Sequence, residues 1–152
     1  MKKIIYSPGE PSGIGPDLII KLSSSKLWEN LKIPIVSIGD PKLFIDRAAL
    51  LKKKIKIIEL ESLNEVSKNT KGLIQIIKVT KCSNTRPGKL SKSNAQYVLD
   101  NLTFSIKQTM QNEGTALVTG PLSKENIISI DKLFTGHTEY IKKITKSNDV
   151  LM

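Results

Sequence analysis

Ser7-Pro-Gly-Glu-Pro-Ser-Gly-Ile-Gly-Pro-Asp17 is the stretch that decides the fold, because it connects a predicted strand to a predicted helix. The apolar residues within Lys3–Ser7 predict a short buried strand that leads into it. Pro16 suits the first turn of a helix, where its missing N–H costs nothing, and Asp17 places a negative charge at the positive end of the helix dipole. This order of strand, turn and helix is typical of α/β proteins.

The same alternation of strands and helices continues along the chain. Apolar runs predict further strands at 33–38, 55–60, 73–79 and 115–119. Apolar residues at helical spacing predict a first helix with the stripe Leu18, Ile19, Leu22 and Leu27, and a second over 41–51 that Asp40 caps. A long helix is predicted to start at a cap formed by Ser91 or Ser93, to reach Met110 and to stop at Gly114. Two further helices are predicted over 122–128 and 138–145. We therefore expect an α/β fold with a mostly parallel sheet flanked by helices.

The last four residues, Asp149–Met152, look like the start of another strand. An apolar run that begins and then stops at the terminus is an unusual way to finish a domain. We therefore expect residues 1–152 to be a truncated part of a longer protein.

Composition limits the classes of protein to consider. The formal charge is +10, but the cations are 22 scattered lysines and only two arginines, Arg47 and Arg86. Nucleic-acid sites favour the bidentate guanidinium of arginine, so we interpret the lysines as a solvated surface and expect no nucleic-acid partner. The single Cys82 excludes an internal disulfide, and no apolar run reaches the roughly 18 residues of a membrane span. We expect a cytoplasmic protein with no membrane partner.

Three stretches fall where ligands bind in open α/β sheets, at the carboxyl ends of strands and beside helix N-termini. The first is the opening turn, in which Gly9, Glu10, Gly13 and Gly15 are candidates for a site loop, because glycines let backbone N–H groups approach a ligand. Gly13-Ile-Gly15 supplies part of the dinucleotide fingerprint, but Leu18 occupies the position of its third glycine. A tight strand-to-helix connection is the alternative interpretation.

The second and third stretches each hold one candidate side chain for an anion. Lys124 ends the stretch that starts at Thr119, and it can meet a phosphate or carboxylate, although it is also one of many surface lysines. His137 is the only histidine, and we predict that Thr138 caps the helix behind it, whose dipole favours an anion. The alternative for His137 is a structural histidine. One histidine and one cysteine cannot form a closed structural zinc site.

These stretches resemble the motifs of the 4-hydroxythreonine-4-phosphate dehydrogenase family. That family has a T/S-P-G-E-P-x-G-I-G-P-D/E opening, which 7–17 matches here. It has a T/S-x-P-x-x-K stretch, matched by 119–124, and an F-x-G-H-T-E motif, matched by 134–139. The order of the motifs agrees, and the resemblance covers the whole chain.

The resemblance implies a fold similar to isocitrate and isopropylmalate dehydrogenases, with two α/β domains around a cleft and homodimers that share active sites. Residues 1–152 would be the N-terminal α/β portion. It implies that 4-phosphooxy-L-threonine is oxidised with NAD and then decarboxylated, in pyridoxal phosphate biosynthesis. A divalent metal (Zn, Mg or Co) held by three histidines would polarise the alcohol oxygen. His137 and Thr138 match the pair that binds the phosphorylated substrate.

Two departures from the family pattern affect these expectations. The metal histidines of the family follow the G-H-T-E motif beyond Met152, so we expect no metal site and no catalytic residue in this chain, and no activity from it alone. Ser123 stands where many relatives have histidine or asparagine. A sister dehydrogenase of threonate or erythronate 4-phosphate is the alternative, and a basic α/β nucleic-acid-binding module ranks last, because the chain lacks a stripe of basic and aromatic residues.

Overall fold

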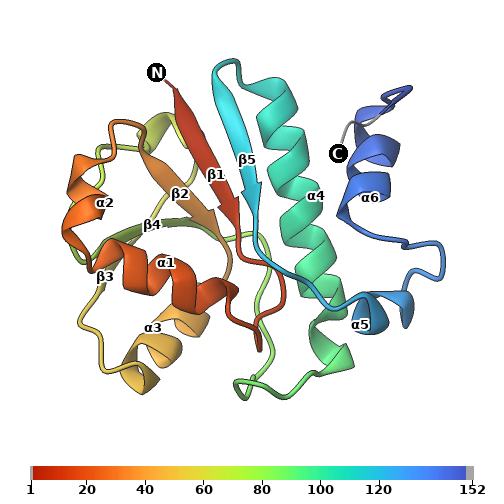
Figure 1. Cartoon of the computed structure of the whole chain (residues 1–152), viewed down its shortest axis with the longest axis horizontal. Coiled ribbons are helices and arrows are strands. Elements are labelled where there is room, and N and C mark those ends of the chain that lie inside the picture. The colour runs from red at the N-terminus through yellow and green to blue at the C-terminus, as the bar shows by residue number, and fades with distance from the viewer. Residues whose placement is uncertain (1, 150–152) are drawn as a thin grey trace.

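A parallel sheet with helices packed on both faces organises residues 2–149, the part of the chain that this computed structural model describes (Figure 1). The sheet has five strands in the order β3-β4-β2-β1-β5, and every neighbouring pair is parallel. The strands are β1 Lys3–Ser7, β2 Ile35–Ile38, β3 Lys56–Glu59, β4 Leu73–Ile77 and β5 Thr115–Thr119. All five predicted strands are confirmed, and β1 and β5 match their predicted bounds. The strand expected at Asp149–Met152 falls mostly on residues outside those described.

Helices fill the connections between the strands. They are α1 Gly15–Ser23, α2 Lys26–Asn30, α3 Pro41–Leu50, α4 Ala95–Gln111, α5 Lys124–Ile128 and α6 His137–Thr145, with single 3-10 turns η1 Leu63–Glu65 and η2 Lys92–Asn94. The predicted Asp40 cap of α3 is confirmed, because its side chain accepts a hydrogen bond from the Lys42 amide. The expected class, α/β with a parallel sheet, is therefore correct.

The central strands are buried on both faces, as parallel strands must be. Tyr6 and Ile76 point to one face, where α1, α2 and α3 contribute to a core cluster that includes Trp28 and Phe44. The alternate residues, among them Ile5, belong to a second cluster on the opposite face, against which Phe104 of α4 and Leu117 of β5 pack. This double burial explains why the strand segments are continuous apolar runs.

The first helix is shorter than its apolar stripe suggested. The hydroxyls of Ser23 and Ser24 both donate to the Ile20 carbonyl and help to end α1. A separate short helix follows, in which Leu27 is 58% exposed while Trp28 is buried. The prediction that Leu27 continues the stripe is therefore wrong, and Leu18 also lies largely at the surface.

Both predicted ends of the long helix α4 need correction. The hydroxyls of Ser91 and Ser93 bond to each other rather than to helix amides, and η2 leads directly into α4 behind Asn94. The helix ends at Gln111, because the side chain of Asn112 donates to the Gln108 carbonyl. Gly114, with a φ of 75°, is the second residue after the C-cap Asn112, whereas the sequence predicted it to be the first residue after the cap.

The position of β1 defines the site-forming edge of the sheet. The chain leaves β1 through α1 to reach β2 on one side, whereas β5, on the other side of β1, is reached only after α4. Ligands in open α/β sheets bind outside the carboxyl ends of strands at such a change of direction. The loops that follow β1 and β5, residues 8–14 and 120–123, lie at this point.

Candidate functional site

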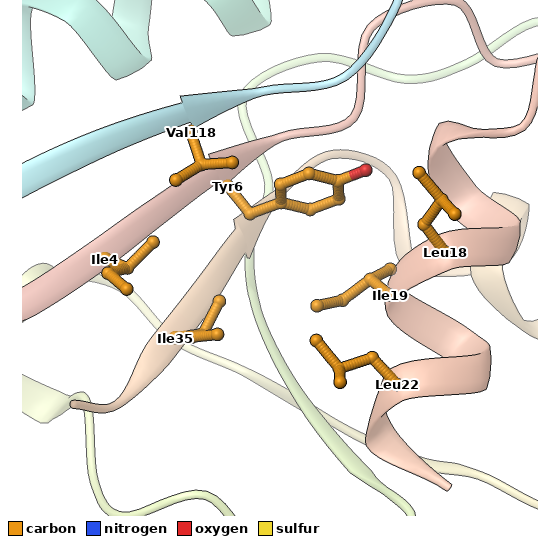
Figure 2. Close-up of a pocket in the computed structure, with 7 residues that line it drawn as sticks. All are labelled: Ile4, Tyr6, Leu18, Ile19, Leu22, Ile35 and Val118. Carbon is orange, nitrogen blue, oxygen red and sulfur yellow. The ribbon is translucent and has the colours of Figure 1, made fainter. Parts of the chain in front are cut away.

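An apolar groove on the α1 face of the sheet is one hollow that could hold a ligand (Figure 2). Its volume is about 170 Å³, and it is lined by Ile4, Tyr6, Leu18, Ile19, Leu22, Ile35 and Val118. The Tyr6 hydroxyl already donates to the Gly15 carbonyl at 2.9 Å. The groove therefore offers no donor to a phosphate, and the site for an anion must lie elsewhere.

The loops after β1 and β5 pack so closely that only glycine fits at their contacts. A Cβ on Gly9 would overlap the carbonyl oxygen of Pro121, and a Cβ on either Gly15 or Gly120 would overlap that of Pro8. The space beside these glycines is therefore taken by neighbouring backbone. This is the tight strand-to-helix connection that the sequence left as an alternative.

Three amides of the opening turn are also used within the protein. Glu10 N–H donates to the Pro121 carbonyl at 2.9 Å, and Gly13 N–H donates to the Glu10 carbonyl at 3.0 Å. Ser12 N–H donates to the Glu10 carboxylate at 3.2 Å. These donors are not available to the pyrophosphate of a dinucleotide, so the turn does not fit NAD in the way that a dinucleotide fingerprint does.

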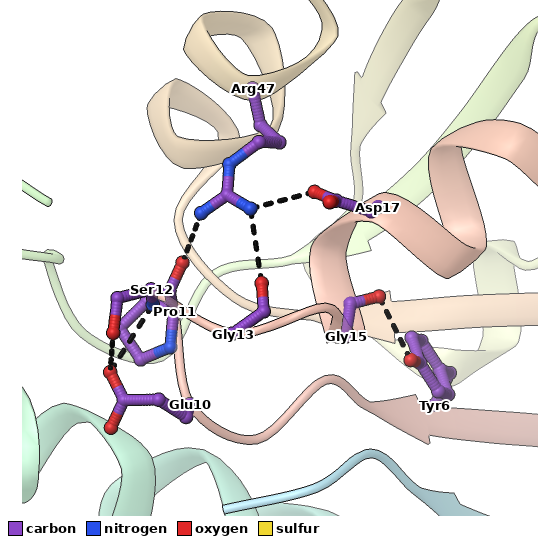
Figure 3. Close-up of polar contacts among 8 residues, drawn as sticks. All are labelled: Tyr6, Glu10, Pro11, Ser12, Gly13, Gly15, Asp17 and Arg47. Atoms are coloured by element: carbon purple, nitrogen blue, oxygen red, sulfur yellow. Dashed lines mark hydrogen bonds and ion pairs between the residues drawn. The ribbon is translucent and has the colours of Figure 1, made fainter. Parts of the chain in front are cut away.

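Arg47 fixes the opening turn from the side of α3 (Figure 3). Its guanidinium donates to the carbonyls of Pro11 and Gly13, at 2.7 and 3.0 Å, and pairs with the Asp17 carboxylate at 2.7 Å. The Arg47 side chain is 4% exposed, so one of the two arginines is buried in the protein interior. Sequence reasoning counted Arg47 as one of two arginines and missed this role, because its partners lie 30 or more positions away.

Glu10 connects the opening turn to α5. One oxygen of its buried carboxylate accepts from the Ser12 hydroxyl at 2.7 Å (Figure 3). The other oxygen accepts from the side-chain amide of Asn126 at 3.2 Å. The turn after β1 and the helix after β5 are thereby joined by a directional contact.

Ser123 and Lys124 begin the short helix α5. The Ser123 hydroxyl accepts from the Asn126 amide at 3.3 Å and caps the helix, which gives this departure from the family pattern a structural role. Lys124 is exposed and extends toward α6. A Cβ added to Gly136 would lie 3.4 Å from Lys124 Cε and 3.2 Å from Glu139 Oε2.

The structure therefore brings the second and third candidate stretches together. Gly136 is the N-cap of α6 and His137 is its first residue, so Lys124 lies beside the start of this helix. The prediction that Thr138 is the cap is wrong, because the helix starts one residue earlier and Thr138 falls in its first turn. His137 and Thr138 are half-buried there.

The positive charge at this place comes from Lys124 and not from His137, and the exposed carboxylate of Glu139 lies beside it. Burial lowers the pKa of His137 from its ordinary value of 6.5, so the imidazole is neutral at pH 7. A neutral imidazole still offers one N–H donor. An ammonium group, an imidazole donor and the positive end of the α6 dipole together suit a phosphate monoester.

Among residues 2–149, no group of three or more His, Cys, Asp or Glu side chains is placed to hold a metal ion. The described residues therefore offer no cluster of ligands for a divalent metal. In the same range, no helix is both long enough and apolar enough to cross a membrane.

The fold defines an α/β protein with a doubly wound parallel sheet, and the segments that follow β5 bring Lys124 to the start of α6. Residues 30–152 match the model of the family described as pyridoxal phosphate biosynthetic protein PdxA, and the chain belongs to this family. The resemblance stated from the three motifs is thereby confirmed.

Curated relatives carry the name 4-hydroxythreonine-4-phosphate dehydrogenase. The protein of Citrobacter koseri is 32% identical over 152 residues, which are 100% of this chain and 45% of the relative. The protein of Methylococcus capsulatus is 35% identical over 150 residues, which are 99% of this chain and 44% of the relative. The chain thus spans under half the length of these relatives.

Solved structures of enzymes with the same name share the fold. One from Klebsiella pneumoniae superimposes with a TM-score of 0.86 at 24% identity, and covers 98% of this chain and 46% of its own. One from Burkholderia phymatum gives a TM-score of 0.86 at 20% identity, with 98% and 45% covered. At these identities the likeness extends to the fold alone.

Proposed function

We propose that this chain is the N-terminal portion of an NAD-dependent dehydrogenase that oxidises 4-hydroxythreonine 4-phosphate, also named 4-phosphooxy-L-threonine, in pyridoxal phosphate biosynthesis. The oxidised product then loses carbon dioxide. Family membership and the names of the relatives support this proposal. The observation that carries it is the contact of Lys124 with Gly136, directly before His137, which joins two of the family motifs.

In this proposal the chain binds and orients the phosphate end of the substrate. The Lys124 ammonium neutralises phosphate charge, and the half-buried His137 directs one N–H to a phosphate oxygen. Thr138 stands next to His137 in the first turn of α6, where the helix dipole favours an anion. An anchored phosphate limits the positions that the rest of the substrate can take, which favours reaction at the distant alcohol.

Other parts of the proposal concern the complete enzyme. NAD and a divalent metal (Zn, Mg or Co) would be held by residues outside this chain, and the active form would be a cytoplasmic homodimer. The metal histidines implied by the family pattern would follow the G-H-T-E motif. No proton or hydride transfer is assigned to a residue of this chain.

Ligand binding to the 152-residue chain tests the proposed site. His137 is the only histidine, so its imidazole resonance in an NMR spectrum reports on the site without ambiguity. We expect 4-hydroxythreonine 4-phosphate to shift this resonance and unphosphorylated 4-hydroxythreonine to leave it in place. Lys124→Met should weaken binding roughly fivefold, as expected for one partly exposed charge contact, whereas Lys107→Met on the exposed part of α4 should not. If the phosphorylated compound does not change the chemical shift of the His137 imidazole in the wild-type chain, the assignment of the site is overturned.

A second measurement concerns activity. We expect the purified chain to form no NADH from 4-hydroxythreonine 4-phosphate and NAD, because no metal-holding group is present among residues 2–149. Turnover above a no-protein control that is abolished by a chelator would contradict this expectation.

A further inference from the structure

We propose that Glu10 is a positioning residue for the phosphate site, and that it acts through Asn126 to place Lys124 beside His137. This inference rests on the proposed function, because it concerns how the same site is built. Glu10 itself touches neither Lys124 nor the expected phosphate. Its role follows from the contacts that join the turn after β1 to α5.

The Glu10 carboxylate is placed to hold two segments at once. It is 5% exposed, and its hydrogen-bond donors are neutral groups: the amide and hydroxyl of Ser12 on one oxygen and the side-chain amide of Asn126 on the other. A carboxylate only accepts hydrogen bonds, so both of its oxygens can face donors. A glutamine would face Asn126 with a donor or would lose the contacts with Ser12. The geometry therefore needs an acceptor on both sides.

Asn126 transmits this contact to the start of α5. Its backbone amide donates to Ser123 Oγ at 3.3 Å, and its side chain donates to Glu10 at 3.2 Å and to the Ser91 carbonyl at 3.4 Å. Lys124 lies in sequence between Ser123, which caps the helix, and Asn126, which is hydrogen-bonded to Glu10. The backbone on both sides of Lys124 is therefore held in place. A displacement of Asn126 would move the backbone that carries Lys124.

The short helix needs such a tether. α5 has five residues, and a helix of this length is not stable on its own. The buried side chain of Ile127 attaches it to the core, but apolar packing is not directional and permits the helix to rotate. The hydrogen bond from Asn126 to Glu10 is directional and fixes that rotation. β1, an interior strand of the sheet between β2 and β5, is thus connected through Glu10 and Asn126 to the position of Lys124.

The first test measures the position of Lys124 without a ligand. In the 152-residue chain, we expect a nuclear Overhauser contact between the Lys124 ε-methylene and the Gly136 α-protons, since the added Cβ position lies 3.4 Å from Lys124 Cε. Glu10→Gln should remove this contact, and Asn126→Ala, which leaves the bonds between Glu10 and Ser12 in place, should do the same. The matched control is Glu65→Gln, because Glu65 also accepts from a serine amide and hydroxyl but is exposed in η1. Persistence of the contact in folded Glu10→Gln and Asn126→Ala chains would overturn the proposal.

The second test measures ligand affinity with 4-hydroxythreonine 4-phosphate as the probe. We expect Glu10→Gln and Asn126→Ala each to weaken binding roughly fivefold, matching Lys124→Met. The double variant Glu10→Gln with Lys124→Met should bind no more weakly than Lys124→Met alone, because both changes remove the same contact, that of Lys124 with the phosphate. Additive losses would show that Glu10 acts independently of Lys124 and would contradict the inference. A wild-type chain that does not bind the probe rejects the proposed function, while the contact measured by NMR still decides the positioning role.

Discussion

The opening turn, residues 8–14, and the segment 134–139 both match family motifs at the carboxyl edge of the sheet, but their contacts and exposure differ. In the opening turn, glycines face backbone, amides bond to protein acceptors and Arg47 closes the turn from α3. In the second segment, His137 is half-buried and Glu139 is exposed. A glycine-rich motif can therefore serve as scaffold, while the shorter motif places His137 at the start of α6, beside Lys124.

Gly15→Ala should give the largest effect if the opening turn is scaffold. The new methyl group would overlap the Pro8 carbonyl, so we expect a loss of roughly 3 kcal/mol in the free energy of unfolding. Urea denaturation followed by the fluorescence of the single, buried Trp28 measures it. Gly88→Ala is the comparison, because no atom lies within 4 Å of its added Cβ and only its φ of 76° is unfavourable, which costs about 1 kcal/mol. Equal losses in the two variants would reject the packing argument.

Arg47→Met should give the next largest effect. It removes the donors to Pro11 and Gly13 and leaves Asp17 unpaired, and we expect a loss of about 2 kcal/mol, since Asp17 remains 21% exposed and can be solvated. The same urea titration applies, and the exposed Arg86→Met should change stability by less than about 0.5 kcal/mol. An Arg47 variant as stable as the Arg86 variant would mean that the turn holds its shape without the guanidinium.

His137→Gln should separate stability from binding. We expect a change of less than about 0.5 kcal/mol in stability, because the side chain is only half-buried, with roughly fivefold weaker binding of 4-hydroxythreonine 4-phosphate by calorimetry. In the complete enzyme, His137→Ala should raise KM for this substrate at saturating NAD. Unchanged affinity and KM would make His137 a structural histidine.

The smallest expected effect is a pH dependence of stability that originates at His137. Burial lowers its pKa in the folded protein below 6.5, so as pH falls through 6.5 the unfolded chain takes up a proton that the folded chain does not. Stability should therefore decrease with falling pH, from about pH 6.5 down to the lowered pKa of the folded protein. Denaturation profiles of wild type and His137→Gln at several pH values isolate this contribution, and parallel profiles would contradict it.

The sequence predicted the architecture better than the contacts of the site. Continuous apolar runs fix parallel strands, and the bounds of β1 and β5 follow from them without error. Capping predictions failed at Ser91, Ser93 and Thr138, because serine and threonine hydroxyls have several local partners and only the folded chain selects among them.

The long-range polar contacts left no pattern in the sequence. Arg47 and the opening turn are separated by more than 30 positions, and Glu10 and Asn126 by 116. No periodicity or spacing rule connects residues at such distances. The sequence named Lys124 as a candidate for an anion, with a surface lysine as the alternative, but its approach to Gly136 depends on how α5 and α6 turn after β5.

The place of β1 in the sheet has a consequence for the order in which the protein folds during synthesis. Among the described strands β1 is made first, yet Lys3 pairs with Thr115 of β5, so one edge of β1 stays open until most of the described chain has been made. Closing a loop of that length loses conformational entropy before any strand hydrogen bond forms, which makes the addition of β5 a slow step. Until then the open edge of β1, with its unpaired N–H and C=O groups, is a surface on which nascent chains can associate, and rapid translation through residue 119 would shorten that exposure.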